Sequence, residues 1–375
     1  MDIGISRRPR ILGLGEPTHQ EDVLLELRND VFRRLVEQDG YRVLAIESDC
    51  LLATAVDDYV TQGTGTLDEA LERGFSHGWG GDSAPNRALL TWMRDVNADR
   101  PAGERLRFAG ADGPLEITGP ESPRAALTWI NEYLGRPCGA ERLEALLGDD
   151  QRWTNPATMF DPTASVGQSA DARELRLLAD DLVARLEMDT PGLIAATSRD
   201  EWDRARLYAR TAQGLLRYHH GMADSSPLRV DRLLGVRDSM MAANILAAAE
   251  WGRTLVFMHN SHLQRTKSSM RLNFDLRPRW WCAGALLDAR VGDDYAFVAT
   301  AVGTIRHHEV GTPPPDTIEG MLYARPGDRF PADPREVAAQ NPVARTSEWF
   351  GYAPLDPAEL AAIDGLVFVR DCTGS

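Results

Sequence analysis

Six short runs rich in Val, Ile, Leu and Phe recur along this chain, and amphipathic segments lie between them. The runs cover residues 10–15, 41–47, 106–112, 254–259, 295–303 and 365–370. Each run is nearly continuous in apolar residues rather than alternating, which is typical of strands covered on both faces in a parallel sheet. Helical patterns such as those at 21–38 and 85–97 alternate with these runs. The alternation predicts an α/β fold in which helices flank a mainly parallel central sheet.

The middle of the chain has a different pattern. From about residue 122 to residue 251 no convincing strand occurs, whereas amphipathic segments cover 169–187, 199–219 and 230–251. Residues 156–168 and 221–227 have the composition of connecting loops. We therefore expect an α/β catalytic core made of residues 1–121 and 252–375, with a helical lobe at 122–251 inserted over the active-site edge of the sheet.

Composition narrows the choice of partners. The chain has 375 residues and a formal net charge of −15, which argues against nucleic acid or an anionic membrane surface as the main partner. No apolar run approaches the length of a membrane span, and no signal-peptide pattern precedes the first strand. The four cysteines are scattered and read as free thiols. We expect a cytoplasmic protein that acts on a small molecule.

Acids and histidines follow four of the predicted strands. Glu16 and His19 follow the first strand, and Glu47 ends the second. The third closes with Asp112, and the fourth closes with His259 and His262. Because the carboxyl ends of parallel strands share one edge of a sheet, we expect these side chains to converge on one cleft facing the helical lobe.

Simpler interpretations of the same residues exist. Thr18 and Glu21 have the spacing of a helix capping box, which would make His19 incidental. His219, His220, His307 and His308 are expected to be structural or solvated. The histidines and acids at the strand ends could hold a zinc ion, although their spacing matches no standard signature. Metal-free acid–base chemistry is the alternative, and the residues alone leave the two nearly even.

The motifs taken together resemble a known family. "GEPTHQEDVLLELR", "LAIESD", "WMRDVN", "FAGAD", "VRDSMM" and "FMHNSHL" occur in the order found in the erythromycin esterase family, whose members are also called succinoglycan biosynthesis protein-like. The resemblance runs from about residue 10 to about residue 370. It implies hydrolysis of an ester or lactone without metal or cofactor, with His19 as the base that activates water.

The resemblance also implies roles for other residues. Glu16 is the partner of His19 in the motif, and Arg28, Glu47, His259 and His262 fall at the family's other catalytic positions. Arg28 and one of the later histidines would stabilise an oxyanion. Trp79, Asp112 and Arg94 are expected to line the substrate site. Arg237 and Asp238 match an Arg–Asp pair, which we expect to be buried and to shape the interface with the lobe.

One departure from the family stands out. Members commonly have glycine after the motif histidine, whereas Gln20, Glu21 and Asp22 follow it here. The rim of the site is therefore expected to be more acidic and polar.

The expected function is hydrolysis of an ester or lactone bond in a macrolide-like secondary metabolite, in antibiotic resistance or in biosynthesis. The alternative is a dehydratase, cyclase or transferase of natural-product biosynthesis on the same site. A binding protein distantly similar to haem-binding lipoproteins is a third interpretation. This third interpretation is disfavoured because those proteins carry an export signal with a lipidated cysteine, and we expect no such signal here.

Overall fold

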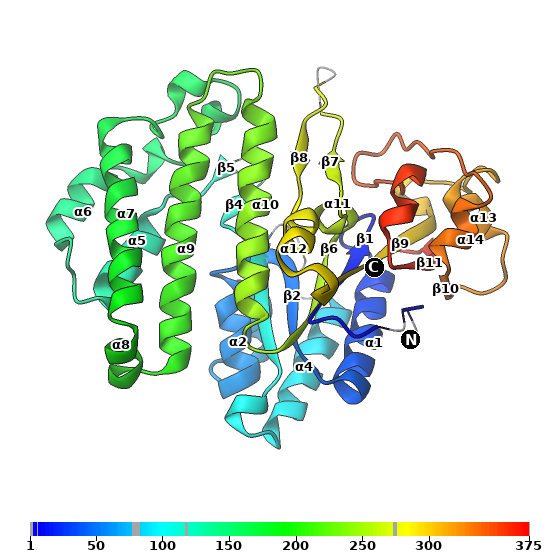
Figure 1. Ribbon diagram of the computed structural model, residues 1–375, viewed down its shortest axis with the longest axis horizontal. Coiled ribbons are helices and arrows are strands. Elements are labelled where there is room, and N and C mark those ends of the chain that lie inside the picture. The colour runs from blue at the N-terminus through cyan, green and yellow to red at the C-terminus, as the bar shows by residue number, and fades with distance from the viewer. Residues whose placement is uncertain (1–2, 6, 77–82, 117–118, 273–275, 375) are drawn as a thin grey trace.

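A seven-stranded sheet lies at the centre of the protein (Figure 1). The computed structural model describes residues 3–5, 7–76, 83–116, 119–272 and 276–374. The strand order is β10-β11-β9-β1-β6-β2-β3, and each neighbouring pair is parallel except β10 with β11. The strands are β1 (Ile11–Glu16), β2 (Tyr41–Asp49), β3 (Arg107–Asp112), β6 (Arg253–His259), β9 (Tyr295–Ile305), β10 (Arg329–Ala332) and β11 (Gly365–Cys372).

The six apolar runs form the six parallel strands, so the predicted fold class is confirmed. The edge strand β10 has no such run, because it is four residues long, contains Pro331 and pairs on one side only. Two short hairpins lie outside the sheet and were also not predicted. They are β4 (Leu115–Glu116) with β5 (Gly119–Pro120), and β7 (Lys267–Ser269) with β8 (Arg279–Trp281).

Helices cover both faces of the sheet, which explains why its strands are apolar on both sides. One face packs against α1 (Asp22–Asp39), α2 (Ala53–Gln62), α3 (Leu67–Arg73) and α4 (Ala84–Ala98). The other face packs against α10 (Arg229–Ala248), α12 (Ala283–Val291), α13 (Ile318–Tyr323) and α14 (Pro334–Ala338). The short helix α11 (Asn260–Leu263) follows β6 directly.

Residues 122–251 are helical, as expected. They form α5 (Arg124–Tyr133), α6 (Ala140–Leu147), α7 (Ala170–Met188), α8 (Thr190–Ala196), α9 (Arg199–Met222) and α10. Helices α5, α6, α7 and α9 share a hydrophobic core of their own, whereas Met241, Ala242 and Ile245 of α10 belong to the core beneath the sheet. Helix α10 therefore joins the two parts, and the proposed boundary of a separate lobe stays a prediction.

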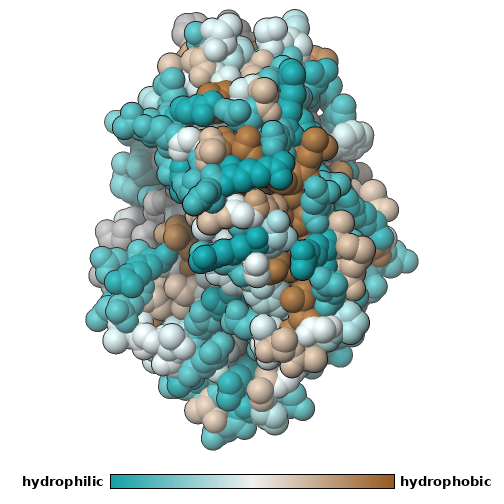
Figure 2. Space-filling model, turned by 90° about the vertical axis from the view of Figure 1, so that its left-hand side faces the viewer, coloured by the Kyte–Doolittle hydropathy of each residue, from teal (hydrophilic) through white to brown (hydrophobic). Residues whose placement is uncertain are grey.

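The outer face of these helices is mainly hydrophilic, with hydrophobic side chains gathered in a narrow band (Figure 2). Such a face is normal for helices that meet solvent on one side. In the part of the chain that the structure describes, no helix is long and apolar enough to cross a membrane.

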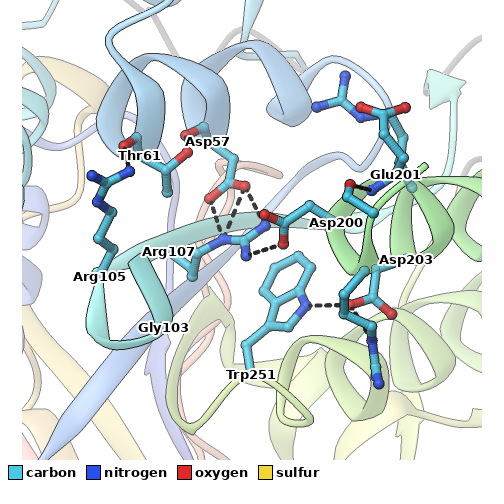
Figure 3. Close-up of polar contacts among 12 residues, drawn as sticks. Asp57, Thr61, Gly103, Arg105, Arg107, Asp200, Glu201, Asp203 and Trp251 are labelled. Atoms are coloured by element: carbon cyan, nitrogen blue, oxygen red, sulfur yellow. Dashed lines mark hydrogen bonds and ion pairs between the residues drawn. The ribbon is translucent and has the colours of Figure 1, made fainter. Parts of the chain in front are cut away.

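Arg107 links the helical segment to the edge strand of the sheet. Its guanidinium donates to both carboxylate oxygens of Asp57 on α2 at 2.7–3.1 Å, and to Asp200 at the start of α9 at 3.0 Å (Figure 3). The same group lies over the ring of Trp251, 4.1 Å from its centroid, and the Trp251 indole donates to Asp203 at 3.2 Å. Three elements distant in sequence thus meet at one cation.

The two acids bound by Arg107 differ in burial, so replacing each one tests how much burial adds to the stability of an ion pair. Asp57→Ala removes a buried carboxylate that also accepts from the Phe108 N–H, and it leaves a largely buried guanidinium short of a partner. We expect a loss of about 3–5 kcal/mol in the free energy of unfolding. Asp200→Ala removes a side chain that is 64% exposed and should cost less than about 1 kcal/mol. Urea unfolding of both variants measures the difference, and equal losses would contradict this account.

Candidate active site

The candidate site forms where four parallel strands end at the same edge of the sheet. Neighbouring positions in the sheet bring β1, β6, β2 and β3 together, and the register pairs Glu16 directly with His259. The side chains that sequence reasoning placed at these strand ends therefore meet in space. They are Glu16, His19, Glu47, Asp112, His259 and His262.

The turn after β1 presents a carboxylate–histidine pair. Nδ1 of His19 lies 2.6 Å from Oε1 of Glu16, which is fully buried. The His19 side chain remains 38% exposed, so this pair reaches from the interior to the surface. Gly15 lets the end of β1 lie close to two neighbouring residues, because a Cβ at this position would lie 2.1 Å from Oδ1 of Asn260 and 2.9 Å from the Phe297 ring.

The capping box is not formed. Helix α1 begins at Asp22 with Glu21 as the N-cap residue, and no side chain caps it. Thr18 is fully buried, and its hydroxyl has no hydrogen-bond partner among the described residues. Gln20 adopts a left-handed conformation (φ 66°), which sets the loop apart from a regular helix start. The loop is therefore shaped by tertiary contacts rather than by a local cap.

Glu47 lies at the centre of the cluster. Its Oε2 accepts from the backbone N–H of His259 at 2.8 Å, and its Oε1 lies 3.4 Å from Nε2 of His262. The same Oε1 lies 3.5 Å from Nη2 of Arg237 and 3.9 Å from Nε2 of His19. Although burial favours the neutral acid, His262, His19 and Arg237 together hold the pKa of Glu47 well below its usual range. Glu47 is therefore ionised.

His262 is held between two carboxylates. Its Nδ1 lies 2.8 Å from Oδ1 of Asp238, and its Nε2 faces Glu47. Burial would lower the pKa of His262, but Asp238 and Glu47 overcome this effect and raise the pKa to about 9. The Asp238 carboxylate is fixed in turn by the indole N–H of Trp280 at 2.7 Å and the N–H of Ala283 at 2.7 Å. His262 is consequently a cation at neutral pH.

The expected Arg237–Asp238 pair separates in the structure. Arg237 turns to Asp112 of β3, to which it donates at 2.6–3.3 Å, and to Glu47, while Asp238 turns to His262. The family resemblance predicts a buried Arg–Asp pair at the lobe interface, and the sequence of a helix carries no local signal that two neighbouring residues have separate partners. Adjacent helical residues point about 100° apart, so they face different parts of the site. Arg237 and Asp238 belong to the site and not only to an interface, and Trp280 is a member of the site that the sequence pattern did not indicate.

His259 has both ring nitrogens engaged. Nδ1 accepts from the N–H of Ser261 at 3.2 Å and lies 2.7 Å from its hydroxyl, while Nε2 lies 3.2 Å from the carbonyl oxygen of Pro17. Burial and the adjacent His19 lower the pKa of His259 to about 3, so the ring is neutral. The centroid of the His259 ring lies 5.4 Å from that of the His19 ring. This geometry suits a residue that holds the His19 loop in place.

The pKa values of both His19 and Glu16 are raised. Burial raises the pKa of Glu16 even though His19 opposes the shift. Burial would lower the pKa of His19, but Glu47 and Glu16 outweigh it and raise that pKa. A proton between these groups is therefore held more tightly than on an isolated residue, which favours proton transfer to His19.

Arg28 lies behind the cluster rather than in it. The guanidinium is fully buried, donates to Asn29 and Asn86 at 2.9–3.1 Å, and lies over the ring of Phe257. Its charge opposes, through space, the rise that burial causes in the pKa of Glu16. Arg28 thus affects the cluster through its charge on Glu16.

One of the expected substrate-site residues, Arg94, packs against a different part of the fold. Arg94 packs its guanidinium against Gly63 at the end of α2, where a Cβ would lie 2.1 Å from its Nη2. Helix α2 runs back from the carboxyl end of β2, so this contact lies at the far end of that helix and the expected role of Arg94 in the site wall is not supported. Trp79 lies outside the described residues.

Within the described residues, one group brings three possible metal-ligand atoms within 4.8 Å of one another, and it lies outside this cluster. It consists of Glu21, His307 and His308. The cluster at the strand ends pairs each histidine with a carboxylate or backbone group, an arrangement that suits proton transfer.

The sequence matches one family of known proteins. The family model described as erythromycin esterase matches residues 36–371. No match was found among curated proteins.

Three solved structures share the fold. A Bacillus cereus protein is 20% identical, with a TM-score of 0.73, over 98% of this chain and 90% of that one. A succinoglycan biosynthesis protein is 17% identical, with a TM-score of 0.67, over 97% and 88% of the two chains. A mutant of the erythromycin esterase EreC in its open conformation is 18% identical, with a TM-score of 0.66, over 98% and 92%.

The charge on His262 depends on Asp238, which predicts a pH effect. Because the folded-state pKa of His262 is raised from 6.5 to about 9, its stabilising contribution is fully present below pH 6.5 and is lost as the pH rises through about 9. Asp238→Asn removes the anion, so the pKa of His262 should fall and this pH-dependent stability should shrink. NMR titration of His262 and urea unfolding between pH 6 and pH 9.5 measure both effects.

Trp280→Phe is the matched control, because it removes one hydrogen bond to Asp238 and keeps the carboxylate. His262 should retain its raised pKa in this variant. An equal fall in both variants would show that packing, rather than the Asp238 charge, sets the pKa of His262.

Proposed function

Because the chain belongs to the erythromycin esterase family, we propose that it hydrolyses an ester or lactone bond of a macrolide-like secondary metabolite with water activated by His19. The observation that carries the proposal is the His19–Glu16 pair, 2.6 Å apart and partly exposed, beside the buried charges of Glu47 and His262. A secondary metabolite of this kind is a neutral or cationic small molecule, which suits a chain of net charge −15.

In this mechanism His19 takes the proton from water. Nδ1–H donates to Glu16, which fixes the ring and stabilises the imidazolium as it forms, so that Nε2 is the basic atom. Oxygen of the activated water then attacks the carbonyl carbon, and the carbonyl oxygen becomes an oxyanion. Collapse of this intermediate expels the alkoxide, to which His19 returns the proton.

Positive charge for the oxyanion comes from the cations that face the cluster. His262 is cationic, and Arg237 keeps 21% of its side chain exposed while it binds Asp112 and Glu47. These charges are held in place before the reaction, and such preorganised groups stabilise an oxyanion more than water does. Arg28 acts on Glu16 instead, because its side chain is fully buried. The chemistry proposed here uses no metal or cofactor.

The same groups would also serve a dehydratase, cyclase or transferase, because each needs a positioned base and a nearby acid. Hydrolysis differs from these reactions because one oxygen atom of the product acid comes from solvent water. A panel of lactones and esters incubated in oxygen-18 water should yield a carboxylic acid that carries one label from solvent, as mass spectrometry would show. Conversion of a substrate without incorporation of label would replace hydrolysis by one of the other reactions.

His19→Ala tests the base directly. We expect kcat to fall by about 10²–10⁴-fold, since general-base catalysis typically contributes that much. KM should change far less, because the water proton moves only in the transition state. The fold should persist, since the His19 side chain is partly exposed and contributes little to the core. The measurements are steady-state kinetics on the substrate found by the panel, with circular dichroism and Tm.

His220→Ala is the matched control, because this histidine lies on α9 outside the cluster. It should leave kcat near that of the parent protein. Near-normal turnover in folded His19→Ala protein would move the base to another residue of the cluster.

A further inference from the structure

Two adjacent histidines after β9 face the loop that carries His19. His307 and His308 lie in the turn at Arg306–His308, and Nε2 of His307 is 2.8 Å from Oε1 of Glu21. The two rings are 4.5 Å apart between centroids. His308 also stacks on Trp349 at 3.8 Å with an interplanar angle of 13°, which fixes its position.

The Glu21 carboxylate is incompletely satisfied. The residue is 2% exposed, yet its Oε2 has no hydrogen-bond partner among the described residues. A buried carboxylate oxygen without a partner is costly, and it suggests a cationic ligand that the two histidines help to bind. Glu21 is also one of the residues by which the sequence departs from the family motif after the histidine.

We propose that Glu21, His307 and His308 bind one zinc ion at a site separate from the catalytic cluster. Their possible ligand atoms all lie within 4.8 Å of one another. Two imidazoles and one carboxylate form a donor set that Zn²⁺ takes, with solvent in the fourth position. The histidines are exposed, so an ion can enter from solvent.

The geometry requires only a small adjustment. Ligands at about 2.1 Å from a tetrahedral ion are separated by about 3.4 Å, so the Glu21–His307 pair must open slightly to admit zinc. His307 keeps 33% of its side chain exposed and has room to do so. His308 stays in place against Trp349.

Zinc at this site would link two segments that are 286 residues apart in sequence. One is the β1–α1 loop, which holds Glu16 and His19, and the other is the turn that follows β9. Because the folded chain alone assembles the three ligands, zinc would stabilise it and the catalytic loop with it. This inference does not depend on which reaction the enzyme performs.

The test is zinc binding by the full-length protein. After treatment with a chelator and dialysis, isothermal titration with ZnCl₂ should show one ion per chain. Zinc at about 100 times its Kd should raise the Tm by about 3 °C for a chain of this size. His308→Ala removes one ligand while leaving the Glu21–His307 hydrogen bond, and Glu21→Gln removes the carboxylate charge. Both variants should lose the site and the shift in Tm.

Two further variants place the ion. His220→Ala removes an unrelated histidine, and His262→Ala removes one from the catalytic cluster, so both should still bind one zinc ion. Zinc binding that persists in His308→Ala and disappears in His262→Ala would assign the ion to the catalytic cluster and overturn the proposal. Absence of binding to the folded parent protein would also overturn it.

The activity of the same samples separates this proposal from the proposed function. The chelated parent protein should hydrolyse its substrate, since the catalytic cluster works without the ion. An inactive protein that still binds zinc through His308 would contradict the hydrolase and leave the zinc site intact.

Discussion

The buried carboxylate of Glu47 is the constraint on which the rest of the site depends. An ionised carboxylate removed from water is costly unless cations and N–H groups surround it. Here the surrounding groups come from four places: the N–H of His259 at the end of β6, His262 on α11, Arg237 on α10 and His19 in the β1–α1 loop. The position of Glu47 therefore limits how each of these elements can pack.

The helical segment has an electrostatic role as well as a covering one. Helix α10 packs on the sheet and supplies two charged residues to the site. Arg237 pairs with acids at the ends of β2 and β3, and Asp238 pairs with His262 on α11. Trp280 from the β7–β8 hairpin holds Asp238 from the other side. Since Asp238 keeps His262 charged, the docking of α10 sets the protonation of the site. The packing of α10 on the sheet and the electrostatics of the candidate site are thus linked through the same few groups.

The β1–α1 loop is held from two sides. On one side His259 lies 3.2 Å from the carbonyl of Pro17, and on the other His307 binds Glu21. The carbonyl of Pro17 also accepts from the N–H of Ala353 at 2.9 Å. A loop fixed in this way can hold His19 in one orientation without a helix cap, and fixed orientation is what general-base catalysis requires.

The amino-acid sequence by itself determined the fold class and the edge of the sheet at which polar groups gather. Apolar runs and polar strand ends are local patterns, and parallel strands necessarily bring those ends together, so the meeting of Glu16, Glu47 and His259 could be anticipated. Only the tertiary structure decided the partners of residues on helices and loops. A charged residue on a helix has the same local pattern whether it meets solvent or a buried acid, so the sequence alone does not show that Arg237 and Asp238 belong to the site or that Arg94 packs against Gly63. Thr18 followed the pattern of a cap, but long-range contacts shaped its loop instead, because their combined energy exceeds that of a single cap.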